Sequence, residues 1–268
     1  ADFSAELAAA VLEAHPLDIA EPWRELETAQ VIRQQAFAHD LIFEATLASV
    51  PQPIAQLLHG RIASYLAARG TSPERLAPHW AGALDWSRAG ECYAAAARRA
   101  QRASQRRHEV SCWHRAAEAF EAAGLPDEAF DARCDSVPSL IVVEGLTKAH
   151  AVIDGLLAAA ATDAKRAAAW TAKATAALMA ADHSTGIAAA LQAETLTASL
   201  PSPWPRFDAA RLRAVGLALA GRTGEALAVI EPWRDRVQAE ADPEHSGRFW
   251  ADYAYVLEQA RIALEGPA

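Results

Sequence analysis

Three segments of the chain repeat one another and decide its fold: LTKAHAVIDGLL at residues 146–157, STGIAAALQAETL at 184–196 and RTGEALAVIEPW at 222–233. They recur about every 38–39 residues, a period typical of stacked helix pairs in which each pair buries its apolar face on the next. In this alignment Ala149, Ala188 and Ala226 fall at matching positions, where a small side chain lets two helices approach. The repeats therefore predict a stack of helical hairpins.

Helix breakers divide the rest of the chain into segments of ordinary helix length. Alanine is abundant, and the 13 glycines and 14 prolines are spaced at intervals, which favours helices with Gly or Pro at their ends. The expected helices are 3–13, 18–29, 37–49, 52–69, 72–83, 86–103, 107–123, 126–143, 145–159, 163–181, 184–199, 205–220, 223–239 and 244–265. We expect an all-α fold in which residues 49–268 form a tetratricopeptide-like α-solenoid, with a unit longer than that family's roughly 34 residues.

The first 48 residues have a different organisation. Two helices, a short extended piece at 31–35 and a further helix resemble a winged helix with a clipped wing, so we expect separate domains at 1–48 and 49–268. Residues 1–45 contain nine acidic and two basic side chains, a net charge of -7. Phosphates would repel such a unit, which argues against DNA binding.

Composition limits the class of protein. The chain's net charge of -9 argues against a nucleic-acid binder, and three widely separated cysteines argue for a reducing cytoplasm rather than a disulfide framework. No uninterrupted apolar run of about 18 residues predicts a membrane span. Because the chain begins with Ala1 rather than Met, we expect it to be a piece of a longer protein.

The segment FAHDLIFEAT at 37–46 places His39 and Asp40 within an apolar helical pattern. At helical spacing Phe37, Leu41 and Ala45 can share one buried side. From the residues alone, His39 and Asp40 therefore have either a packing and capping role or a contact to a bound molecule.

Three stretches of the first hundred residues together resemble a known class: FAHDLIFEATLASVP at 37–51, LLHGRIASYLAARG at 57–70 and LAPHWAGALDWSRAGECYAAAARRAQ at 76–101. They are similar to the winged-helix and tetratricopeptide-like region of the signal-transduction ATPases with numerous domains (STAND), which include large ATP-binding LuxR-type transcriptional regulators. The resemblance implies a non-catalytic regulatory arm in a bacterial cytoplasm. Its partner would be a protein, its own upstream ATPase domain or a small-molecule inducer on the concave face of the stack.

By the same resemblance, His39 and Asp40 occupy nucleotide-sensor positions, where His39 would face the β-phosphate of ADP and Asp40 would brace the helix start. The chain departs from the family at Phe43, where an arginine is frequent. No G-x-x-x-x-G-K-[ST] motif occurs, so no loop of this chain is predicted to cradle phosphates. ATP or ADP would bind an upstream domain, and this fragment is expected to hold no cofactor and no metal and to be no enzyme.

An arginine run and a His-Cys pair each have a functional and a structural explanation. Five arginines at 98, 99, 102, 106 and 107 suggest a phosphate site, but a helix C-terminus attracts cations in the same way. His108 and Cys112 share a helix face as a metal pair does, without further ligands at metal-site spacing. The alternative function is a free-standing helical-repeat scaffold, and an upstream phosphate-binding loop would distinguish the two.

Overall fold

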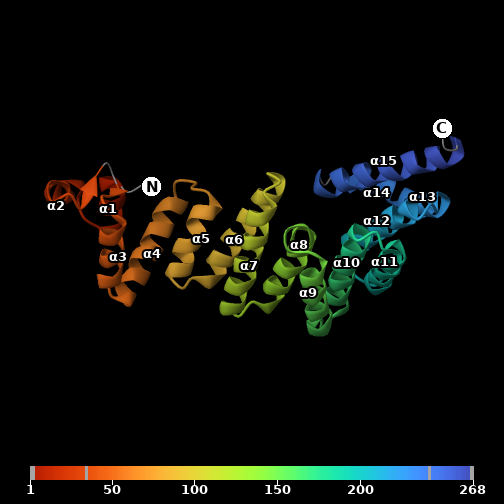
Figure 1. Cartoon of the computed structure of the whole chain (residues 1–268), viewed down its shortest axis with the longest axis horizontal. Coiled ribbons are helices and arrows are strands. Elements are labelled where there is room, and N and C mark those ends of the chain that lie inside the picture. Colours follow the sequence, from red (N-terminus) through yellow and green to blue (C-terminus); the bar gives the residue numbers. More distant parts are fainter. Residues whose placement is uncertain (1–3, 34–35, 241–242, 266–268) are drawn as a thin grey trace. The chain divides into compact units, whose positions relative to one another are not determined.

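The computed structural model describes residues 4–33, 36–240 and 243–265, and it consists of helices apart from one small ribbon (Figure 1). The predicted all-α helical-hairpin fold is confirmed. The chain forms two compact units, residues 1–129 and 130–268, here called unit 1 and unit 2. Residues 1–48 belong to unit 1, and the predicted domain boundary at residue 49 stays a prediction.

Unit 1 begins with α1 (Ala5–Leu12), α2 (Pro16–Thr28), β1 (Ile32–Arg33), β2 (Ala36–Phe37) and α3 (Asp40–Ser49). The strands pair antiparallel, with Ile32 opposite Phe37. This is the predicted order of two helices, an extended piece and a helix. The winged-helix assignment stays a prediction, because order alone does not establish it.

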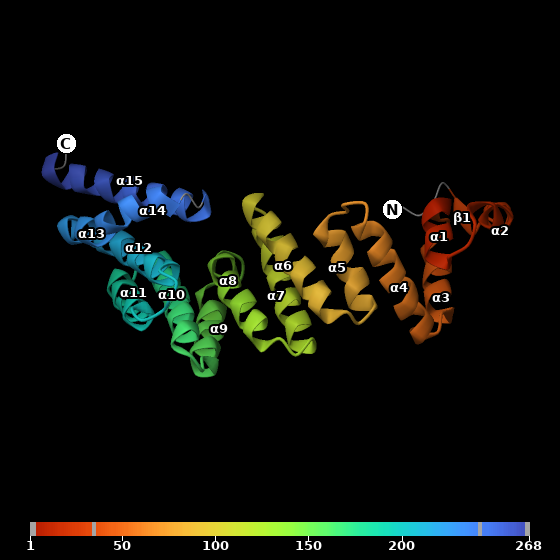
Figure 2. The ribbon, with the colours of Figure 1, turned by 180° about the vertical axis from the view of Figure 1, so that it is seen from behind.

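The rest of unit 1 is a series of antiparallel helices: α4 (Gln52–Ala67), α5 (Pro73–Gly82), α6 (Trp86–Arg102) and α7 (Arg106–Ala122), followed by the start of α8 (Pro126–Glu144). Helix α4 packs on α5, α5 on α6 and α6 on α7, as both ribbon views show (Figure 2). Small residues make the contacts close. Gly90 of α6 lies so near Phe120 of α7 that an added Cβ would stand 2.6 Å from the ring.

Unit 2 continues the pattern with the rest of α8 and with α9 (Leu146–Ala159), α10 (Asp163–Met179), α11 (His183–Thr197), α12 (Trp204–Leu219), α13 (Thr223–Ile230), η1 (Glu231–Trp233), α14 (Arg234–Glu240) and α15 (Pro243–Glu265). Consecutive helices from α9 to α13 pack on one another, and α15 lies against α12 and α13. Phe207, Phe249 and Val256 are fully buried where these three helices meet, so α15 covers the apolar end of the hairpin stack.

The structure corrects the register of the repeats. Ala149 and Ala226 are each the fourth residue of their helix and are fully buried, as the repeats predict. Ala188, however, is exposed, and the fourth residue of α11 is the buried Gly186. An added Cβ at Gly186 would stand 2.6 Å from Cδ2 of Leu178. The prediction for Ala188 was wrong because α11 begins at His183 and the loop after it, at 198–203, is longer than the loop after α9, at 160–162, so the spacing between repeats is not uniform.

Two predicted helices are also corrected. The helix expected at 223–239 is interrupted by a 3-10 turn at Glu231–Trp233, because Pro232 has no N–H for an interior helical hydrogen bond. The helix expected at 37–49 begins at Asp40, since Ala36 and Phe37 pair with β1.

Candidate functional site

His39 and Asp40 lie at the start of α3 and are both exposed. His39 is the N-cap residue, with extended backbone and no side-chain hydrogen bond to the helix. Asp40 stands in the first turn, where a carboxylate is favoured by the helix dipole. The structure brings the two residues together at a helix start, and a nucleotide contact for them stays a prediction.

The predicted buried side of this helix was wrong. Helix α3 has no buried residue, Leu41 is 78% exposed and Ala45 is also exposed. Phe37 is half-buried, with its ring centroid 5.3 Å from that of Phe43. Leu41 and Ala45 lie one helical turn apart as predicted, but no described segment of the chain buries them.

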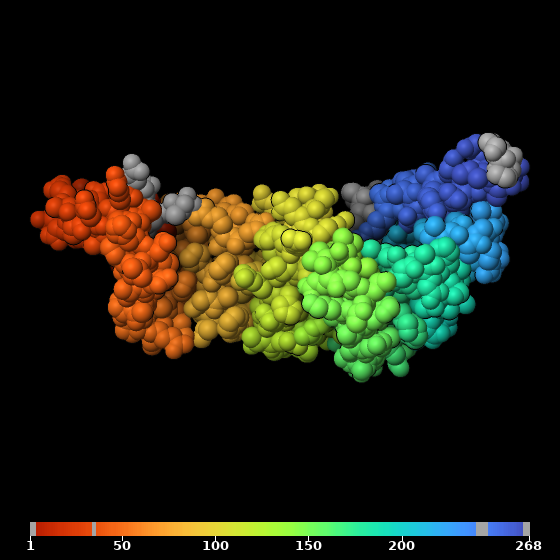
Figure 3. All heavy atoms as spheres, in the orientation of Figure 1, coloured from red at the N-terminus to blue at the C-terminus, as the bar shows by residue number. Residues whose placement is uncertain are grey.

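Large apolar side chains are exposed on α3 and on the following helix, α4. We call this set the head surface: Leu41, Phe43, Leu47, Ile54 and Leu57, which are between 43% and 78% exposed. The two helices are consecutive in the chain and appear in orange (Figure 3). Single exposed apolar residues are ordinary, but several on adjoining elements are typical of an interaction surface.

A groove of about 700 Å³ lies next to the head surface, and we call it the α4 groove. Its floor is one face of α4, and its walls come from α1, from α5 and from the turn into α6. Its lining residues are Ala10, Pro53, Gln56, Leu57, Gly60, Arg61, Ser64, Tyr65, Trp80, Ala83 and Asp85. Leu57 belongs to both the groove and the head surface, so the two form a continuous candidate site.

The charged groups of the α4 groove already have partners. Arg61 donates to the carbonyl of Val11 over 2.9 Å and pairs with Glu13 over 3.0 Å, which ties the end of α1 to α4. Asp85 accepts from the backbone N–H of Arg88 as the N-cap of α6. What the groove leaves to a bound molecule is apolar and aromatic surface together with the side chains of Gln56 and Ser64, a mixture typical of binding pockets.

Behind this site, α4 and α5 meet through a pair of histidines. Nδ1 of His59 and Nδ1 of His79 are 3.0 Å apart, so one nitrogen donates a proton and the other accepts it. Burial lowers the pKa of His79, and the nearby His59 and Arg75 lower that pKa further. The lowered pKa favours a neutral His79 ring at neutral pH, which suits this contact.

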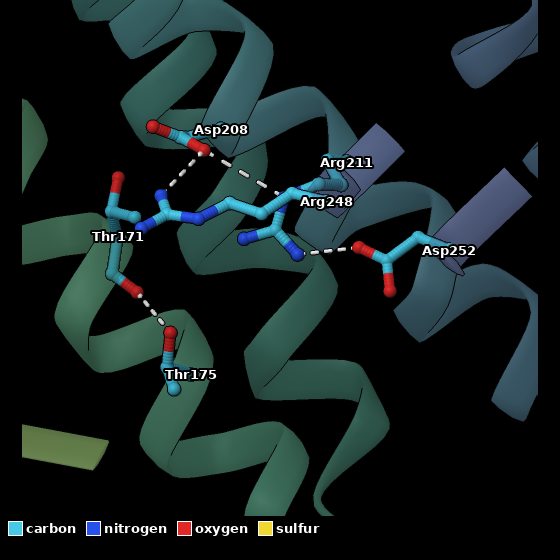
Figure 4. Close-up of polar contacts among 6 residues, drawn as sticks. All are labelled: Thr171, Thr175, Asp208, Arg211, Arg248 and Asp252. Atoms are coloured by element: carbon cyan, nitrogen blue, oxygen red, sulfur yellow. Dashed lines mark hydrogen bonds and ion pairs between the residues drawn. The ribbon is translucent and has the colours of Figure 1, made fainter. Parts of the chain in front are cut away.

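Unit 2 contains a second polar group, the α12–α15 ion-pair cluster: Asp208 and Arg211 of α12 with Arg248 and Asp252 of α15 (Figure 4). Arg211 hydrogen-bonds to Asp252, and Arg248 lies 3.6 Å from Asp208. Arg211 Nε also lies 3.7 Å from Asp208 Oδ1. Each helix contributes one arginine and one aspartate, so the charges balance and two ion pairs join α15 to α12.

Helix α10 borders this cluster with Thr171 and Thr175 (Figure 4). Their hydroxyls donate to the carbonyls of Ala167 and Thr171, at 2.9 Å and 3.0 Å. They satisfy their own helix, and the charge of the cluster is balanced without them. The cluster is thus better explained by helix packing than by a ligand.

The arginine run is divided between two helix ends. Arg99 and Arg102 stand in the last turn of α6, where cations offset the helix dipole. Arg98 lies over the ring of Trp113, and Arg99 lies 3.7 Å from Glu74. Local contacts of these side chains therefore account for part of the run.

The suggested metal pair is a short contact on α7. Cys112 Sγ lies 3.6 Å from Nε2 of His108. Burial raises the pKa of the Cys112 thiol, which disfavours the thiolate that metals bind. Over the residues that the structure describes, no group of three metal-binding side chains comes together.

Sequence reasoning missed the α4 groove, the histidine pair and the ion-pair cluster. Asp252 is 41 residues from Arg211, and His59 is 20 residues from His79. No local pattern joins such pairs. The head surface had a signal, since its apolar spacing was recognised, but the pattern does not tell whether a core or a partner covers it.

No family model, curated protein or solved structure matches this chain. Among the helices of the described residues, none has both the length and the apolar character that crossing a membrane requires.

Proposed function

We propose that this chain is the non-catalytic regulatory arm of a cytoplasmic signalling ATPase, in the manner of a large transcriptional regulator, and that it binds a protein partner through the head surface of unit 1. The observation behind the proposal is the head surface, five large apolar side chains left exposed on α3 and α4. The resemblance of residues 37–101 to STAND proteins supplies the kind of parent protein.

Partner binding fits the physical form of the site. A domain that covered the head surface would remove Leu41, Leu47 and Leu57 from water, a gain of about 25 cal/mol for each Å² of apolar area buried. Helix α3 has no buried residue of its own to hold it. A partner would therefore also order α3, and signals would pass if it bound one arrangement of α3 and α4 better than another.

The nucleotide part of the proposal is tested with the chain itself. Calorimetry with ATP and with ADP should detect no binding, and an assay of phosphate release should detect no hydrolysis, because the chain has no phosphate-binding loop. Tight binding of either nucleotide to this chain alone would refute the proposed non-catalytic role.

The partner part is tested in the full-length protein. The double substitution Leu41→Ser and Leu47→Ser should change the rate of ATP hydrolysis or ADP release by the whole protein. The control is Leu264→Ser, since Leu264 is 88% exposed and stands on α15 in unit 2. Equal effects of the two variants, or none from the double variant, would argue against docking at the head surface.

A free-standing scaffold is the second candidate, and the α4 groove favours it. A groove of about 700 Å³ with apolar and aromatic walls accepts a partner segment without any nucleotide. The coding sequence upstream of Ala1 separates the candidates: a phosphate-binding loop there supports the regulator, and an in-frame start near Ala1 supports the scaffold.

A further inference from the structure

Acidic side chains lie among the apolar residues of the head surface. Glu44 is three residues from both Leu41 and Leu47, and such neighbours stand side by side on a helix. Asp40 is four residues before Glu44 and lies on the same side. Both acids are exposed, and within the described residues neither has an ion-pair or hydrogen-bond partner. The exposed side of α3 is therefore both apolar and anionic.

The surrounding helices do not neutralise this charge. Helix α4 contains a single arginine, Arg61, and it already pairs with Glu13, the C-cap residue of α1. Residues 1–45 have a net charge of -7. A partner that covered α3 without a cation would place Asp40 and Glu44 in a poorer solvent, at a cost in free energy. A second copy of this chain would bring the same acids against these.

We propose that the head surface binds a basic amphipathic helix, with a stripe of Leu, Ile or Phe flanked by Lys or Arg. The apolar stripe would cover Leu41, Leu47 and Leu57, and the flanking cations would meet Asp40 and Glu44. Apolar burial supplies the affinity, and charge complementarity selects the partner and speeds encounter. This inference rests on the proposed partner-binding function and adds the chemistry of the partner.

The test uses this chain and three fluorescent helical peptides of equal length. The first has a leucine stripe with lysine flanks, the second has the same stripe with glutamate flanks, and the third has lysine flanks with serine in place of leucine. By fluorescence anisotropy the first should bind best, and the other two should bind at least about tenfold more weakly. Raising NaCl should weaken the first peptide's binding.

Matched variants locate the binding. Leu41→Ser with Leu47→Ser should abolish binding of the first peptide, while Asp40→Asn with Glu44→Gln should weaken it and flatten its salt dependence. The controls are Leu264→Ser and Asp235→Asn, at exposed positions of unit 2. Both control variants leave the head surface unchanged and the protein acidic, so both should bind the first peptide as the wild type does.

Three results would overturn the inference. One is equal binding of the lysine-flanked and glutamate-flanked peptides, and another is binding that the head variants and the controls affect alike. The third is a dimer of this chain that Leu47→Ser dissolves and that the first peptide does not displace. The proposed function is tested separately, by the effect of the head variants on nucleotide turnover in the full-length protein. If that effect is seen, these three results refute the basic-helix inference alone.

Discussion

At the scale of single residues, two equivalent turns of unit 2 have the same left-handed backbone but different residue types. Helices α10 and α12 are each followed, just after the C-cap, by a residue of left-handed backbone, Ala181 with φ 59° and Gly221 with φ 76°. In this region the Cβ of any other residue than glycine crowds the backbone, at a cost of about 1–2 kcal/mol. Ala181 is therefore strained where Gly221 is not.

The substitution Ala181→Gly should raise the free energy of unfolding by about 0.5–1 kcal/mol, because relief of strain exceeds the extra freedom of glycine in the unfolded chain. Gly221→Ala is the matched control and should lower it by a similar amount. Urea unfolding followed by circular dichroism measures both. The same sign of change in the two variants would contradict this account of the turns.

At the scale of elements, the histidine contact makes the packing of α4 on α5 sensitive to pH. The pKa of His79 is lowered in the folded chain by burial, by His59 and by Arg75. Below about pH 6.5 the unfolded chain then binds more protons than the folded one. Stability should be fully present above this pH and should fall as pH drops toward the folded pKa.

The measurement is the urea midpoint between pH 8 and pH 5, for the wild type and for His79→Gln. The wild type should lose more stability on acidification than the variant does, because glutamine takes up no proton. His114→Gln is the control, since His114 is exposed and pairs with Glu118 on its own helix. A pH dependence that His79→Gln leaves unchanged would assign the effect to other groups.

The α12–α15 ion-pair cluster gives a second prediction at this scale. The side chains of Arg211 and Asp252 are only 18% and 23% exposed, so removing one partner leaves the other charged group poorly solvated. Arg211→Gln should cost about 1–3 kcal/mol, and adding Asp252→Asn to it should cost little more, because that removes the unpaired charge.

Thermal unfolding of the two single variants and the double variant gives the coupling energy of the pair by a double-mutant cycle. Amide exchange in α15 should quicken in the single variants, since α15 would lose one of its ion pairs to α12 and keep the pair of Arg248 with Asp208. The exposed pair of Arg222 and Glu225 is the control, and its loss should change little. Additive effects of the two substitutions would show that the charges do not stabilise each other.

The sequence predicted helices better than it predicted their surroundings. Gly, Pro and capping residues act locally, so α6, expected at 86–103, was found at Trp86–Arg102. The choice of Ala188 over Gly186 failed because a repeat alignment does not include loop length. The exposure of Leu41 was missed because apolar spacing is the same toward a core and toward a partner.

The candidate site could be anticipated only in part. The prediction placed Asp40 near the start of a helix that began at residue 37, and the structure begins this helix at Asp40 with His39 as its N-cap. The α4 groove depends on how α1, α4 and α5 pack, and the contact of Arg61 with Val11 spans 50 residues. Such distant contacts leave no period or motif in the sequence. Functional surfaces built from them become visible only once the helices are assembled.

At the scale of the whole molecule, charge is distributed unevenly along the chain. The total is -9, of which residues 1–45 supply -7. Helix α2 displays Glu21 and Glu25 one turn apart and exposed. A helix of this charge placed in a DNA groove would meet phosphates with like charge, whatever the shape of the head.

The chain should therefore not bind double-stranded DNA, even at low salt where electrostatic binding is strongest. A mobility-shift assay with random-sequence DNA checks this, with Glu21→Lys and Glu25→Lys combined as the informative variant. Reversing two charges should produce weak binding that disappears as NaCl rises, if charge is the barrier. A shift by the wild type at physiological salt would refute the argument. Absence of binding by both proteins would instead show that the head lacks the shape to bind DNA, so that charge is not what excludes it.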